Sequence, residues 1–309
     1  MSGAGLQPAL AFSRVSLWYG NVLGVSDISF SIQSGVVGLL GMNGAGKSTM
    51  MKLASGMIRP SIGSVEVFGK PPQESTEIRN RIGLCPDMDR FYERMSAHAW
   101  VTFMARLAGV PSAKQKAAEV LDRLDMSDRM HKKIGGYSKG MRQRTKLARA
   151  LVVGADLLLL DEPLNGLDPI GRHAMIRLVR ELGDEGKAVL VSSHVLHEVE
   201  AMTDRLLLLH QGRILAEGKV HEIRDQLSER ALQVEVRVRE PRSLARQLIG
   251  ATHVAGVDVE KDRVVARVAD AGLFFDQITD LGCDERYGIE AIVPLDADLE
   301  SVFGYLVRK

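Results

Sequence analysis

Cysteine and long hydrophobic runs are scarce in this sequence. Its 309 residues include two cysteines, Cys85 and Cys283, so neither a disulfide framework nor a cysteine metal site can be built, and a reduced, cytosolic setting fits. No stretch approaches the roughly 20 apolar residues of a membrane-spanning helix. The densest runs, Leu157–Leu160 and Leu206–Leu209, have the length of buried strands. If the protein works at a membrane, we expect another chain to cross it.

The sequence also has almost no net charge and shows no targeting signal at Met1–Pro8. The formal net charge is +1, which gives no electrostatic reason to expect nucleic acid as the main partner. The segment Met1–Pro8 has no basic region followed by an apolar core, so we expect no signal peptide. A content of 45% hydrophobic and 26% charged residues predicts a packed globular core, in one large domain or two ordinary ones.

A glycine-rich loop stands out against this background. Residues Gly41–Thr49 read Gly-Met-Asn-Gly-Ala-Gly-Lys-Ser-Thr, which fits the phosphate-binding pattern G-x-x-x-x-G-K-[ST]. A short apolar run precedes the loop as a strand would, and a helical segment follows it. We expect Lys47 to reach the β- and γ-phosphates of a nucleotide and the Ser48 hydroxyl to bind Mg²⁺. The predicted nucleotide ligands here are Gly41, Asn43, Gly44, Ala45, Gly46, Lys47, Ser48 and Thr49.

Two acidic residues follow the apolar run Leu157–Leu160 directly. An acid at a strand end is ordinarily only solvated, but two in sequence after four leucines are hard to explain in that way. We expect Asp161 to hold Mg²⁺ and Glu162 to act as a general base on water. His194 also ends a predicted buried strand, Ala188–Ser192. A lone histidine is usually structural, but this position favours contact with a γ-phosphate.

Tyr19 ends the first of two segments within Ala9–Ile32 that alternate apolar and polar residues and predict an antiparallel sheet. Its ring could stack on adenine, or it could simply pack on its neighbours at the strand end. Further strands are predicted at Ser64–Phe68 and Arg81–Cys85. Helical spacing follows from Phe91 to about Arg129.

The helical region leaves one question open. Its stripe of Trp100, Phe103 and Met104 could be core or could grip a partner helix. Ser112, within this region, and Ser138, beyond it, are each predicted to cap the helix that follows them. The helix that Ser138 begins runs to about Val153, and its cationic residues are expected to face solvent: Arg142, Arg144, Lys146 and Arg149.

Taken together, these motifs resemble those of ATP-binding cassette (ABC) ATPases. The loop Gly41–Thr49, the signature Tyr137–Arg144, the strand Leu157–Glu162, the turn Asn165–Asp168 and Ser193-His194 occur in the order seen in that family, within about Ala9–Gly218. The resemblance implies an α/β fold: a mixed-sheet P-loop core, an antiparallel β subdomain and a helical subdomain at about residues 90–136.

The resemblance also implies a dimer. Two cassettes would close head to tail on two ATP molecules, each ATP lying between Gly41–Thr49 of one subunit and the signature of the other. The signature contacts would come from Ser138, Lys139, Gly140 and Met141. Asp168 would act across the interface, and His194 would respond to the γ-phosphate.

Two positions depart from the family pattern. Lys139 replaces the first of two glycines in the usual Leu-Ser-Gly-Gly-Gln signature. Asp87 stands where the loop that couples ATP to the membrane subunit usually presents glutamine. An acid there can still bind Mg²⁺ or water. We therefore expect Asp87 among the nucleotide and metal ligands.

The Tyr-Ser-Lys-Gly-Met signature resembles the branch that powers bacterial exporters with a separate membrane subunit. That implies an ATP-hydrolysing subunit peripheral to the cytoplasmic face of the bacterial inner membrane, with an integral membrane permease and a second, identical cassette as partners. The alternative is a soluble cassette ATPase acting on DNA or ribosomes, for which we see neither an inserted coiled coil nor a tandem cassette. A third class, a non-hydrolysing ATP sensor, is disfavoured because Lys47, Asp161, Glu162 and His194 are all intact.

Beyond Gly218 the composition changes. We expect a linker at residues 219–230, with a helix over Lys219–Leu227, and an accessory domain at 231–309. The predicted order there is β-α-β-β-α-β with a last helix over Leu299–Leu306, which suggests a small ferredoxin-like α/β module. It resembles the C-terminal extension of the exporter branch. An interface or regulatory role and a purely stabilising one both remain open.

Overall fold

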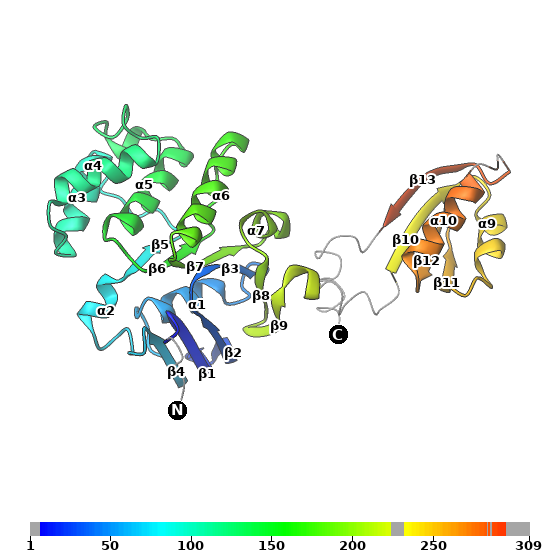
Figure 1. Cartoon of the computed structure of the whole chain (residues 1–309), viewed down its shortest axis with the longest axis horizontal. Coiled ribbons are helices and arrows are strands. Elements are labelled where there is room, and N and C mark those ends of the chain that lie inside the picture. The colour runs from blue at the N-terminus through cyan, green and yellow to red at the C-terminus, as the bar shows by residue number, and fades with distance from the viewer. Residues whose placement is uncertain (1–6, 224–231, 283, 285, 295–309) are drawn as a thin grey trace. The chain divides into compact units, whose positions relative to one another are not determined.

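The computed structural model of the chain describes residues 7–223, 232–282, 284 and 286–294. Its contacts divide the chain into two compact units, residues 1–220 and 221–309 (Figure 1). Within the described residues, none of the helices is both long and apolar enough to cross a membrane.

A six-stranded sheet forms the centre of the first unit. Its first five strands in spatial order are parallel to their neighbours, and the last is antiparallel. The strands of the parallel part are short apolar runs buried on both faces, as expected for strands covered on both sides. The order is β5 (Ile82–Cys85), β6 (Leu157–Asp161), β7 (Ala188–Ser193), β3 (Gly35–Leu40), β8 (Arg205–His210) and β9 (Arg213–Lys219).

The predicted antiparallel sheet is present and packs over one face of the central sheet. It has the order β2 (Val22–Ile32), β1 (Leu10–Tyr19) and β4 (Ile62–Val67). Helix α1 (Lys47–Ala54) shares its apolar core, to which Leu157 and Leu159 of the central sheet also belong. Figure 1 shows α1 beside these strands.

Helices cover the other face, where Leu158 and Leu160 belong to a second apolar core. The alternation of four consecutive leucines between two cores follows from the period of two in a strand. Besides α1, the helices of the first unit whose bounds lie in the described residues are α2 (Thr76–Asn80), α3 (Ala97–Leu107), α4 (Ala113–Arg123), the 3₁₀ turn η1 (Ile134–Gly136), α5 (Lys139–Val152), α6 (Pro169–Asp184) and α7 (Leu196–Met202).

Three details of the helical region refine the sequence analysis. Trp100 is buried core, whereas Phe103 is 41% exposed, so the stripe serves both interior and surface. Ser112 does precede α4, but its φ is +53° and its side chain makes no capping hydrogen bond, so the predicted cap is wrong. Lys146 was expected to face solvent. It is buried instead, because it meets partners in the loop after β5.

The second unit is a four-stranded antiparallel sheet with two helices. Its sheet order is that of a ferredoxin-like module, in which the first strand lies between the third and the fourth. This confirms the predicted fold class. The elements are β10 (Leu232–Val238), α9 (Pro241–Leu248), β11 (Val254–Val259), β12 (Arg263–Val268), α10 (Ala271–Gly282) and β13 (Ile289–Pro294).

Two predicted helices fall wholly or partly beyond this description. The segment Leu299–Leu306 lies outside the described residues. Within Lys219–Leu227, Lys219 ends β9 and residues 220–223 are helical, while the remainder is outside the described part.

Candidate nucleotide site

The glycine-rich loop joins β3 to α1 in a conformation that favours glycine. Gly44 and Gly46 have φ values of +84° and +110°, in the left-handed region that side chains disfavour. A Cβ at Gly46 would also lie 2.9 Å from the carbonyl oxygen of Gly24. The loop ends where α1 begins at Lys47, so the helix N-terminus faces the space in front of the loop.

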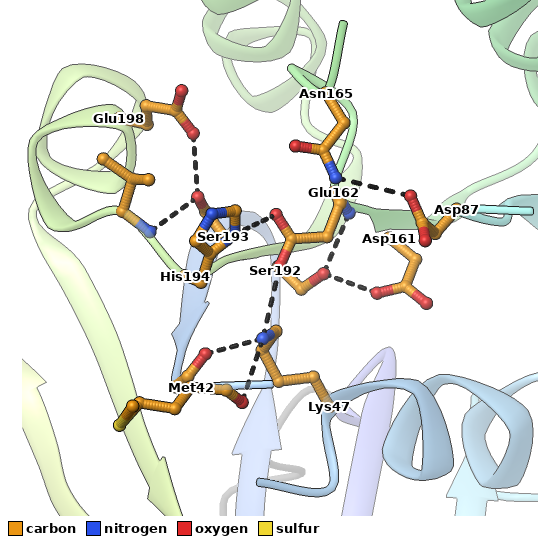
Figure 2. Close-up of polar contacts among 12 residues, drawn as sticks. Met42, Lys47, Asp87, Asp161, Glu162, Asn165, Ser192, Ser193, His194 and Glu198 are labelled. Carbon is orange, nitrogen blue, oxygen red and sulfur yellow. Dashed lines mark hydrogen bonds and ion pairs between the residues drawn. The ribbon is translucent and has the colours of Figure 1, made fainter. Parts of the chain in front are cut away.

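Lys47 is almost fully buried, with 6% of its surface exposed. Its Nζ donates a 2.6 Å hydrogen bond to the carbonyl of Gly41 and a 3.3 Å one to that of Met42 (Figure 2). Nζ also lies 3.2 Å from Oε1 of Glu162. The ammonium group is therefore held between the loop and the end of β6.

The two carboxylates are placed by the neighbouring strand β7. Asp161 pairs with Ser192 in the parallel register. Ser192 Oγ donates a 2.7 Å hydrogen bond to Oδ1 of Asp161 and accepts a 3.0 Å one from the backbone N–H of Glu162. Figure 2 shows this serine between the two acidic residues. Ser192 is not among the predicted site residues, although its position just before Ser193-His194 at a strand end is a usable signal.

Asp161 also connects the sheet to the loop. Its Oδ2 accepts a 2.8 Å hydrogen bond from Oγ of Ser48, at the start of α1. The predicted pair of metal ligands, Ser48 and Asp161, is thus in direct contact, although the residues are far apart in the sequence.

Glu162 is buried and has an unusual backbone conformation. It is 7% exposed, and its φ of +50° is unusual for a residue with a side chain. Its Oε2 lies 3.0 Å from Nδ1 of His194. Its Oε1 forms the ion pair with Lys47 and accepts no hydrogen bond within the described residues. One carboxylate oxygen is therefore held by His194, and the other retains acceptor capacity.

Lys47, Ser48, Asp161 and Glu162 line one cleft of about 310 Å³. Ser192 and His194 contact the two acidic residues from outside this lining. Tyr19 lies next to the cleft rather than in its lining, 45% exposed, with a ring atom 3.0 Å from where a Cβ of Gly24 would stand. The cleft is also lined by Val22, Leu23 and Gly24, at the start of β2, which are not among the predicted site residues. The first residues of a strand carry no sequence pattern that marks them as ligand contacts. The full lining is Val22, Leu23, Gly24, Met42, Asn43, Gly44, Gly46, Lys47, Ser48, Thr49, Asp87, Asp161 and Glu162.

Asp87 reaches the cleft from the loop after β5. Its Oδ1 accepts a 3.4 Å hydrogen bond from Nδ2 of Asn165, in the turn after β6. Just before it, burial raises the pKa of the Cys85 thiol to about 12. Cys85 is therefore a neutral core residue rather than a reactive one.

The predicted signature residues lie at a different place in the same unit. Ser138 caps α5 by accepting a 3.3 Å hydrogen bond from the N–H of Met141, and Asp168 caps α6 by accepting a 2.7 Å one from that of Gly171. Lys139 packs its side chain directly on Gly166. These residues do not line the cleft of their own chain, so a role in nucleotide binding requires a second chain.

Comparison with known proteins decides the family. Residues 25–165 match the sequence profile of the family described as "ABC transporter". The "Nod factor export ATP-binding protein I" of Burkholderia orbicola (strain AU 1054) is 37% identical over 216 residues, which are 69% of this chain and 71% of that protein. The chain belongs to the ABC transporter ATPases.

Other ABC proteins extend the comparison. The "Daunorubicin/doxorubicin resistance ATP-binding protein DrrA" of Streptomyces peucetius is 33% identical over 248 residues, covering 79% of this chain and 74% of that one. The solved "Structure of ATP binding subunit of ABC transporter" superposes with a TM-score of 0.65 and 28% identity, over 71% of this chain and 92% of the other. The chain is thus an ATP-binding subunit of the ABC type, with ATPase activity.

Proposed function

We propose that this ABC ATPase drives export through a separate membrane permease, by closing on ATP with a second cassette and hydrolysing it. The observation that carries the proposal is the setting of Glu162. One of its oxygens contacts His194, the other has acceptor capacity left, and Lys47 lies beside it at the edge of the cleft.

The cleft residues suit a magnesium nucleotide. Ser48 and Asp161 offer a hydroxyl and a carboxylate oxygen side by side, and Asp87 adds a further carboxylate to the lining. Mg²⁺ favours such oxygen ligands and takes the rest from water and phosphates, so no cage of protein ligands is required. When bound, it would neutralise phosphate charge during transfer.

The chain's own residues then supply the reaction. The glycine-rich loop and Lys47 would orient the β- and γ-phosphates. Glu162 would accept a proton from a water molecule as that water attacks the γ-phosphorus in line, and the bond to the ADP oxygen would break. His194 would hold the Glu162 carboxylate in position and contact the γ-phosphate.

A second cassette would complete the site. The signature Ser138–Met141 and Asp168 lie away from the cleft of their own chain, with Ser138 at the N-terminus of α5. A helix N-terminus is a favourable position for a phosphate. In a head-to-tail dimer of identical chains, each α5 N-terminus would face the ATP bound by the other subunit.

Export is supported by the relatives. One is named for Nod factor export and another for daunorubicin/doxorubicin resistance. We infer the same direction here, with the chain on the cytoplasmic face of a bacterial inner membrane and a permease as partner. The alternative, a soluble cassette ATPase on DNA or ribosomes, has no observation in its favour.

Two measurements test this proposal. Glu162→Gln is expected to lower phosphate release by at least about 100-fold while ATP still binds; unchanged turnover would show that Glu162 is not the base. Tagged chain is then purified from native membranes in mild detergent. A stoichiometric multi-span protein is expected with it, whereas recovery with ribosomes, DNA or nothing would exclude the exporter.

A further inference from the structure

The loop after β5 is fastened to α5 by a buried lysine. Lys146 Nζ donates a 2.6 Å hydrogen bond to the backbone carbonyl of Asp87 and lies 3.1 Å from Oδ1 of Asp89. The Lys146 side chain is 6% exposed and that of Asp89 is 37% exposed. An ammonium group is costly to bury unless it is paired and hydrogen-bonded, and here it is both.

Two other residues of α5 hold the same stretch of chain. Arg142 donates two 2.8 Å hydrogen bonds to the carboxylate of Glu93 and lies 3.9 Å from Asp89. Gln143, at the adjacent position, lies with its Nε2 4.0 Å from Sγ of Cys85. From Cys85 to Glu93 the loop is therefore attached to α5 at several points.

Lys146 contacts the one residue of this loop that lines the cleft. It holds the Asp87 backbone, while Asn165 contacts the Asp87 carboxylate at 3.4 Å. Asp87 is thus held at both ends, and its side chain is directed toward the cleft that Asp161 and Glu162 line. Removing the lysine leaves Asp87 in the chain but frees its backbone.

We propose that Lys146 is a positioning residue for ATP hydrolysis, acting through Asp87. It sits two helical turns beyond Ser138 on the same helix. A shift of the α5 N-terminus is therefore passed to the Asp87 carbonyl within one rigid element. This inference rests on the proposed function, because it assigns Asp87 a role in the turnover of ATP.

A double-mutant cycle tests the inference in the full-length chain. The variants are Lys146→Met, which keeps the aliphatic stem, Asp87→Ala, and the two combined; Lys146→Gln replaces Lys146→Met if the latter does not fold. Arg123→Met is the control, because it removes a cation of α4 that pairs at 2.6 Å with Glu185, the residue that follows α6. The kcat and KM for ATP are measured for each variant.

Lys146→Met is expected to lower kcat about tenfold when Asp87 is present and less than about twofold when Asp87 is already alanine. Arg123→Met is expected to leave kcat within about twofold. If Lys146→Met lowered kcat equally with Asp87 and with alanine at position 87, Lys146 would only stabilise the fold. An unchanged kcat in the presence of Asp87 would also overturn the inference.

Amide hydrogen exchange gives a second readout that does not depend on turnover. Peptides covering residues 85–89 should exchange about tenfold faster in Lys146→Met and unchanged in Arg123→Met. Unaltered exchange in Lys146→Met would overturn the inference. If the wild-type chain released no phosphate, the proposed function would fail, and this measurement would still decide whether Lys146 holds the loop.

Discussion

At the residue scale, single polar atoms in the site hold more than one functional residue in place. Ser192 is the clearest case, because one hydroxyl serves both Asp161 and the backbone of Glu162. All three residues are buried. Such shared hydroxyls position charged groups without adding charge of their own.

Ser192→Ala therefore has a predictable cost. It leaves the Glu162 N–H buried without an acceptor, which should lower the free energy of unfolding by about 1–3 kcal/mol. The loss of the hydrogen bond to the Asp161 carboxylate should also lower kcat about tenfold. Urea unfolding and phosphate release measure the two effects. Ser64→Ala, at an exposed position of β4, is the control and should change neither.

Cys85 offers a test of burial. Because burial raises its thiol pKa to about 12, the thiol stays protonated at pH 8, and iodoacetamide should leave it unmodified in the folded chain. Peptide mass spectrometry distinguishes it from Cys283. Rapid labelling of Cys85 in native buffer would contradict the buried setting.

The same shift sets a pH dependence. In the unfolded chain the thiol ionises from its ordinary value of 9.0, whereas in the folded chain it stays neutral up to about 12. The contribution of Cys85 to stability is thus complete below pH 9 and is lost as the pH rises between these values. Cys85→Ala should reduce this alkaline loss in urea titrations.

At the scale of elements, motifs whose conformation is set by residues adjacent in the sequence could be predicted. The loop before α1 and the strand β6 with its two acids follow from local pattern alone. The contacts of Lys146 could not be found in that way. Periodicity places its position on α5 but says nothing of the loop after β5, 59 residues earlier, that covers it.

Helix caps show the same limit and give a matched pair. Ser96 caps α3 with a 3.2 Å hydrogen bond from the N–H of Ala99, whereas Ser112 at α4 makes none and has a φ of +53°. Ser96→Ala should therefore lower the free energy of unfolding by about 1 kcal/mol. Ser112→Gly should leave it unchanged or raise it by up to about 1 kcal/mol, since glycine accepts positive φ. Urea unfolding of both variants measures these free energies, and an equal loss of stability in the two would contradict the prediction.

At the scale of the whole molecule, the two units have separate cores. The cleft residues all belong to the first unit, and the ferredoxin-like unit has an apolar core of its own, built on Val234, Val236 and Phe274. Alternating strands and two helical stripes were sufficient to predict that second fold. Its role could not be predicted, because no chemistry-bearing motif lies in it.

A chain that ends after Ile223 should still bind ATP. Its dissociation constant for a fluorescent ATP analogue should stay within about threefold of the full-length value, because every residue lining the cleft is retained. Lys47→Met in the same shortened chain is the control and should abolish binding. Loss of binding in the unmutated short chain would show that the second unit is required for the site.

The sheet order has a consequence for synthesis on the ribosome. The strand β3, which precedes the glycine-rich loop, pairs with β7 and β8, and these follow it by about 150 and 170 residues. At about 5–20 residues per second, the loop leaves the ribosome on the order of ten seconds before the strands that fix it. During that interval β3 is an apolar segment without the two strands that flank it in the sheet. Nascent chains shorter than about 210 residues should therefore recruit chaperones and hold no nucleotide.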